Sequence, residues 1–172
     1  MATVAETIRR VAWAANIDPA GIKNLFIGDR VPRLGNPEQE RALECVLIDK
    51  GIEVLCLDPL YLMLSGENQA NLSGQGAELA GITSICAKLG VTLVLADHTR
   101  KAAAVNYEPL GLDSITGAGK GEWARQWLLL NRREAFAPGM GSHRLWLSVG
   151  GSHGQNGALL CRGRRPRRSR GP

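Results

Sequence analysis

Two aspartates stand directly after apolar runs that are typical of buried β-strands. Residues 52–57 (IEVLCL) are followed by Asp58, and residues 91–96 (VTLVLA) are followed by Asp97 and His98. A run this apolar suits a parallel sheet that is covered on both faces. Ligands of such sheets bind outside the carboxyl ends of the strands, where a carboxylate can hold Mg²⁺ beside a phosphate. The pattern predicts a site here, although an aspartate before a turn proline can also simply cap a loop.

The elements that must position these residues follow from local signals. Asn36 is a candidate N-cap for a helix that runs to about Lys50, with Gly51 as its C′ residue. A second helix is expected over about 77–89, between the two apolar strands, and this strand–helix–strand order is the signature of an α/β sheet. An earlier helix is expected from a capping box at Thr3 to about Asn16. Residues 25–27 are a short strand candidate.

The second half of the chain has a different character. Residues 126–131 (QWLLLN) and 144–149 (RLWLSV) flank a turn at 138–141 and predict an antiparallel hairpin at the sheet edge. Residues 156–172 are rich in glycine and arginine without periodicity, and we expect them to form a disordered tail. The expected fold class is therefore α/β, a mainly parallel sheet with helices on both faces and a C-terminal edge hairpin.

The basic character of the chain is concentrated at its C-terminus. The formal charge is +5, yet six arginines lie in the last eleven residues, and the remainder has 15 basic against 16 acidic residues. The charge therefore belongs to the tail more than to the folded domain. Either a disordered terminus, out-of-frame sequence after about Ala158, or a nucleic-acid arm accounts for these arginines.

Cysteine usage indicates a reducing compartment, and hydropathy gives no sign of a membrane span. The four cysteines show no CxxC or Cys/His spacing, and Cys56, inside an apolar strand pattern, is interpreted as a small core residue. No apolar run approaches the ~20 residues of a membrane span, and the N-terminus does not resemble a signal peptide. We expect a cytoplasmic protein without a membrane partner.

Three segments in order resemble the RecA-like P-loop ATPases of the replicative hexameric helicase type, with the plasmid RepA helicases and related "AAA family ATPase" proteins as the nearest group. They are residues 54–62 (VLCLDPLYL), 93–101 (LVLADHTRK) and 116–127 (TGAGKGEWARQW). The resemblance covers roughly residues 1–155. It implies a RecA-like core that binds ATP with Mg²⁺ between the subunits of a hexameric ring and that acts on single-stranded DNA in replication.

The resemblance also implies roles for individual residues. Asp58 matches the Walker B aspartate that binds Mg²⁺, and His98 matches the polar sensor of the γ-phosphate. Arg100 and Lys101 match a basic pair that contacts the nucleotide. Arg125, after the glycine-rich turn, matches an arginine finger that acts across a subunit interface, and we expect it to point outward from a short helix whose buried face carries Trp123 and Trp127.

The chain departs from the family at the phosphate-binding loop. No Gly-x-x-x-x-Gly-Lys-Ser/Thr sequence is present, and Gly119-Lys120 lacks both the first glycine and the following Ser or Thr. The family's water-activating glutamate would precede Thr3. We therefore expect the C-terminal part of an ATPase core, inactive alone.

Other interpretations stay open for the same residues. His98 can be a structural loop histidine, and Asp58, Asp97 and His98 can form a two-carboxylate hydrolytic metal site. Arg132 and Arg133 can be a solvated strand end. The rival function is a non-catalytic α/β module that binds nucleic acid or a partner through its basic tail.

Overall fold

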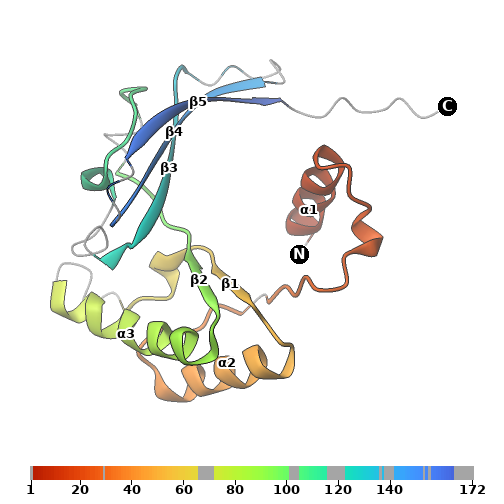
Figure 1. Cartoon of the computed structure of the whole chain (residues 1–172), viewed down its shortest axis with the longest axis vertical. Coiled ribbons are helices and arrows are strands. Elements are labelled where there is room, and N and C mark those ends of the chain that lie inside the picture. The colour runs from red at the N-terminus through yellow and green to blue at the C-terminus, as the bar shows by residue number, and fades with distance from the viewer. Residues whose placement is uncertain are drawn as a thin grey trace.

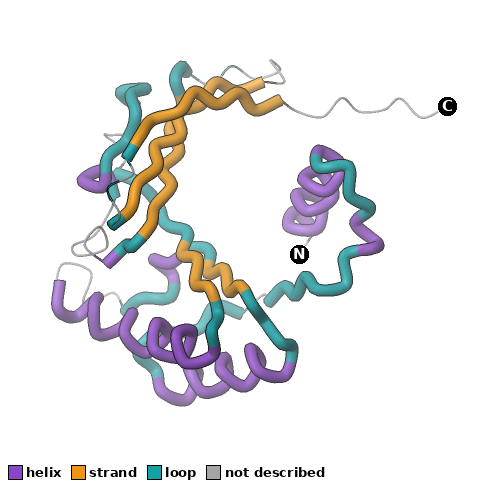
Figure 2. The backbone as a smooth tube through the Cα atoms, viewed as in Figure 1, coloured by secondary structure: helices purple, strands orange, loops and turns teal. Residues whose placement is uncertain are grey.

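The computed structural model shows a mixed α/β chain with two separate sheets (Figures 1 and 2). A two-stranded parallel sheet lies beside two helices, and a three-stranded antiparallel sheet stands at the other end of the molecule. The structure describes residues 2–28, 30–65, 72–100, 105–115, 123–135, 137, 142–152, 154 and 156–164.

The parallel sheet pairs β1 (Val54–Leu57) with β2 (Thr92–Leu95), and α3 (Leu72–Leu89) connects them. The register runs from Val54 opposite Thr92 to Leu57 opposite Leu95. This confirms the predicted strand–helix–strand unit. Each strand is four residues long, shorter than the apolar run that predicted it.

The core lies on one face of this sheet only. Leu55, Leu57, Leu93 and Leu95 pack toward α3 and toward α2 (Pro37–Asp49), where Ile82 is fully buried. The opposite face carries side chains that alternate with these, and they are exposed: Val54 at 58% and Val94 at 44%. Within the described residues, helices therefore cover one face rather than the expected two.

Cys56 lies on that bare face. It was interpreted as a core residue, but it is exposed, whereas Cys86 of α3 is buried in the core. The reason is the period of two along a strand, which places Cys56 on the same side as Val54 and opposite Leu57. An apolar strand predicts burial on both faces only where a second layer is present.

The ends of α2 follow the predicted local chemistry. The side chain of Asn36 accepts hydrogen bonds from the backbone N–H groups of Glu38 and Gln39, both at 3.1 Å. Gly51 adopts φ +57° after the helix, which is the left-handed conformation that a C′ glycine provides. These bonds satisfy backbone groups that a helix end leaves without partners.

The N-terminal prediction holds only in part. α1 (Ala2–Ala14) is helical, but it begins at Ala2, so Thr3 lies inside the helix instead of capping it. Residues 25–27 do not form the expected strand, and Leu25, Phe26 and Ile27 are about half exposed. Figure 1 shows α1 standing apart from both sheets, and Val11 of this helix is accordingly 63% exposed.

The antiparallel sheet is a meander of β3 (Gln126–Arg132), β4 (Ser142–Gly151) and β5 (Gly157–Arg164). The hairpin of β3 and β4 was predicted, but it forms its own sheet rather than extending the parallel one. The expectation that residues 156–172 form a disordered tail is wrong for β5. This strand pairs with β4 in a register that runs from Ser142 opposite Arg164 to Val149 opposite Gly157. β5 was missed because backbone pairing with a neighbour, rather than periodicity of its own, defines it. Residues 165–172 lie outside the described part.

The segment 105–115 packs on one face of this sheet. The amide nitrogen of the Asn131 side chain donates to the carbonyl of Glu108 at 2.8 Å, and the indole N–H of Trp146 donates to the carbonyl of Tyr107 at 2.8 Å. Leu129 and Ser148 are buried on this face. The opposite face exposes Leu128 at 72% and Leu130 at 60%.

Candidate functional site

Asp58 and His98 follow the carboxyl ends of neighbouring parallel strands. Leu57 pairs with Leu95, so Asp58 and Ala96 leave the sheet at the same level. Ala96 then joins the two strand ends, because its N–H donates to the carbonyl of Leu57 at 2.9 Å and its own carbonyl accepts from Leu60 N–H at 2.8 Å. The prediction that these residues share one edge of the sheet is confirmed.

The carboxylate of Asp58 is exposed at this edge. It follows a buried residue, Leu57, which is 5% exposed and anchors the strand end in the core. The position therefore combines a fixed backbone with an accessible carboxylate, as a ligand for a hard cation requires.

Asp97 has a different role from Asp58. Its Oδ1 atom accepts a hydrogen bond from the N–H of His98 at 2.8 Å, which orders the turn that follows β2. Within the residues that the structure describes, no three His, Cys, Asp or Glu side chains gather as a metal-binding group.

Tyr61 is a member of this site that sequence reasoning did not single out. It lies in the short 3₁₀ helix η2 (Leu60–Leu62), three residues after Asp58, and its ring centroid is 5.3 Å from that of His98 with the planes tilted by 43°. The contact links the loop after β1 to the loop after β2. An aromatic residue shortly after a strand-end aspartate was the available signal.

Arg100 continues the same strand-end loop. Its N–H donates to the carbonyl of Ser114 at 2.9 Å, next to an antiparallel bridge between Thr99 and Ile115. These bonds fix its backbone while the residue is exposed. Lys101, predicted to act with it, lies outside the described residues.

Arg125 belongs to the other sheet. It sits in a loop immediately before β3 and is exposed, and its carbonyl accepts from Ser152 N–H at 2.9 Å. Among the contacts of the described residues, none joins Arg125 to Asp58 or His98. The structure therefore places Asp58 and His98 at one edge of the parallel sheet. Arg100 follows two residues after His98 in the loop after β2, and Arg125 precedes β3 of the other sheet.

The short helix expected to carry Arg125 does not extend to that residue. Trp123 is helical, but Arg125 lies in a bend, and the expected turn at 116–119, like all of 116–122, lies outside the described residues. Trp127 is on β3, since Gln126 already pairs with Gly151. Trp123 packs against the core of the parallel sheet, whereas the Trp127 ring lies against Gly150 of β4, where a Cβ atom would clash with it. The two tryptophans thus do not share a helical face, because strand pairing takes precedence over helical spacing here.

Comparison with known proteins adds no family. No protein-family model matches the chain, and no curated protein matches it. As for membrane spans, none of the helices within the described residues has the length and hydropathy needed to cross a bilayer.

Proposed function

We propose that this chain is part of a RecA-like motor core that binds and hydrolyses ATP, of the type found in replicative DNA helicases. The observation that carries the proposal is the placement of Asp58 and His98 at the carboxyl ends of adjacent parallel strands. In P-loop enzymes, a strand-end aspartate holds Mg²⁺ beside the nucleotide phosphates.

The residues present fit a magnesium ion that is shared with a nucleotide. Mg²⁺ usually takes one or two carboxylates together with phosphate oxygens and water, so the single exposed carboxylate of Asp58 suffices. The bound ion would neutralise charge on the phosphates. Beside it, His98 is oriented by the Tyr61 ring and by the backbone bond to Asp97, and Arg100 supplies positive charge.

The complete motor would be a ring of six identical subunits in the cytoplasm that acts on single-stranded DNA. Arg125 would serve the nucleotide of the neighbouring subunit, because it is exposed and lies in the loop immediately before β3 of the other sheet.

The experiment is to express the chain joined to the polypeptide encoded directly before Met1 and to measure Mg²⁺-dependent ATP hydrolysis. The chain alone should show negligible turnover, because backbone N–H groups and a lysine that cradle the phosphates are missing from its sequence. The joined protein should hydrolyse ATP, and Asp58→Asn should lower the rate by about a hundredfold or more.

Asp49→Asn is the matched control, since Asp49 is an exposed carboxylate at the end of α2 that forms an ion pair with its neighbour Lys50. It should leave the rate unchanged. If the joined protein is inactive, or if Asp58→Asn is as active as the parent, the motor assignment fails. Either result would support the alternative function, a non-catalytic module that binds nucleic acid or a partner.

A further inference from the structure

Positive and negative charge are unevenly distributed between two parts of the chain. Residues 123–172, which contain the antiparallel sheet, have ten arginines, no lysine and a single acid, Glu134. Residues 1–122, which contain the parallel sheet, have eleven basic and fifteen acidic residues. The formal charge is therefore +9 on the second part and −4 on the first.

The meander collects much of this charge at one end of the sheet. The carboxyl ends of β3 and β5 and the amino end of β4 all lie there, since neighbouring strands are antiparallel. Arg162 is opposite Arg144, Arg164 is opposite Ser142, and the N–H of Arg133 donates to the carbonyl of Arg144 at 3.1 Å. We call the described side chains of this region the basic sheet end: Arg132, Arg133, His143 and Arg144.

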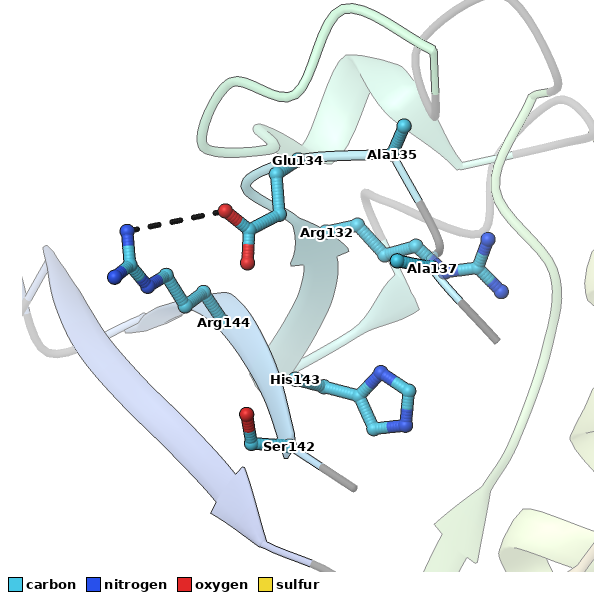
Figure 3. Close-up of a pocket in the computed structure, with 7 residues that line it drawn as sticks. All are labelled: Arg132, Glu134, Ala135, Ala137, Ser142, His143 and Arg144. Carbon is cyan, nitrogen blue, oxygen red and sulfur yellow. Dashed lines mark ion pairs between the residues drawn. The ribbon is translucent and has the colours of Figure 1, made fainter. Parts of the chain in front are cut away.

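Three residues of the basic sheet end, Arg132, His143 and Arg144, line a hollow of about 270 Å³ together with Glu134, Ser142 and alanines 135 and 137. Figure 3 shows Arg132 and His143 extending to the same side, while Arg144 turns the other way toward Glu134. Cationic groups therefore face both sides of the sheet at this end.

The local partners of Arg144 and Arg133 leave these two guanidinium groups able to bind an anion. The guanidinium of Arg144 is 3.8 Å from the Glu134 carboxylate, and both side chains are about half exposed, so the pair is weak and open to exchange. Arg133 stacks on the Trp146 ring at 4.8 Å, and such stacking orders a guanidinium without neutralising its charge.

We propose that the basic sheet end is a binding surface for the phosphate backbone of nucleic acid. The region has arginines and no lysine. The planar guanidinium group of arginine can donate two parallel hydrogen bonds to a pair of phosphate oxygens. The sequence adds Arg165, Arg167, Arg168 and Arg170 directly after the last residue of β5. The surface makes no use of Asp58 or His98, so it stands or falls independently of ATP hydrolysis.

The test is binding of fluorescein-labelled oligonucleotides to the full chain, followed by anisotropy between 50 and 200 mM salt. Both a single-stranded dT20 and a duplex of mixed sequence should bind with affinity that falls steeply with salt and shows no sequence preference. A triple variant, Arg132→Gln, Arg133→Gln and Arg144→Gln, should weaken binding about tenfold. It should also reduce the slope of log K against log salt by about 2, because each lost phosphate contact contributes ~0.7–0.9.

The matched control removes the same charge elsewhere. Arg9→Gln, Arg10→Gln and Arg41→Gln change three exposed arginines of α1 and α2, and binding should change less than about twofold. Equal weakening by the control would show that only net charge matters and would overturn the surface.

If the triple variant unfolds, a second variant that should raise the affinity for oligonucleotides tests the proposal instead. Glu134→Gln removes the one acid among residues 123–172, and it should tighten oligonucleotide binding about twofold to threefold. Deleting residues 165–172 should weaken binding and leave a salt-dependent remainder that Glu134→Gln still strengthens.

Besides equal weakening by the control, two outcomes would overturn the proposal. One is binding that disappears entirely with residues 165–172 while the triple variant of the full chain binds like the parent. The other is binding to neither oligonucleotide, and binding to vesicles of phosphatidylserine in that case would make the surface a membrane contact.

Discussion

The ring of Tyr61 packs against the ring of His98, with centroids 5.3 Å apart. The two residues come from the loops after different strands and are 37 positions apart in the sequence. The contact therefore reports whether the strand ends of the parallel sheet are assembled. It also offers a direct handle on the candidate site, since neither ring belongs to the core.

Removal of the Tyr61 ring should change the surroundings of His98 with little loss of stability. Tyr61→Ala should cost about 0.5 kcal/mol, the low end for an aromatic pair, because Tyr61 is 43% exposed. The His98 ring proton resonances should move in NMR spectra, whereas Tyr61→Phe should leave them near their original positions. Unchanged resonances in Tyr61→Ala would show that the rings are not in contact in solution.

The bare face of the parallel sheet should be visible in cysteine reactivity. Cys56 is exposed, whereas burial raises the pKa of the Cys86 thiol and lowers its thiolate fraction at pH 8. Iodoacetamide should therefore modify Cys56 well before Cys86, as followed by peptide mass spectrometry. Exposed Cys45 on α2 provides the reference rate, and protection of Cys56 relative to it would mean that another layer covers this face.

The core under the parallel sheet should depend strongly on α3. Ile82 is fully buried, so Ile82→Ala should lower the free energy of unfolding by about 2–5 kcal/mol in urea titrations. Ile48→Ala is the matched control, because Ile48 of α2 is 62% exposed, and it should stay within about 0.5 kcal/mol. Equal effects of the two substitutions would contradict the packing.

The segment 105–115 should be attached to the antiparallel sheet by the Trp146 indole. Trp146→Phe removes the donor to the Tyr107 carbonyl and should cost about 1 kcal/mol. Trp13→Phe on α1, where the ring is 64% exposed, should have almost no effect. Thermal melts of both variants check this, and a silent Trp146→Phe would mean that the bond does not stabilise the fold.

Arg125 provides the test of action between subunits in the joined, ATP-hydrolysing protein. Arg125→Ala should leave ATP binding and folding nearly unchanged and lower hydrolysis by about a hundredfold, as expected when a transition-state contact is lost. Mixing it with Asp58→Asn should restore part of the activity at hybrid interfaces. Full activity of Arg125→Ala would remove the finger role and leave the role of Asp58 standing.

Local patterns in the sequence predicted the parts of the fold that depend on neighbours along the chain. The Asn36 cap, the Gly51 C′ position and the strand–helix–strand order all appear as expected. The placement of Asp58 and His98 at one edge of the sheet was also predictable, since two parallel strands joined by a helix have their carboxyl ends at the same edge.

Pairing and layering between distant segments were decided only by the tertiary structure. The apolar run of β1 did not reveal that Val54 and Cys56 would face outward, because burial depends on what packs against each face. β5 has no strand pattern of its own and exists through its register with β4. Arg125 occupies a loop because β3 begins at Gln126, and the basic sheet end exists because antiparallel pairing places Arg144 opposite Arg162. The sequence determines periodicity, caps and charge, whereas partners remote in the chain determine which faces and ends those residues share.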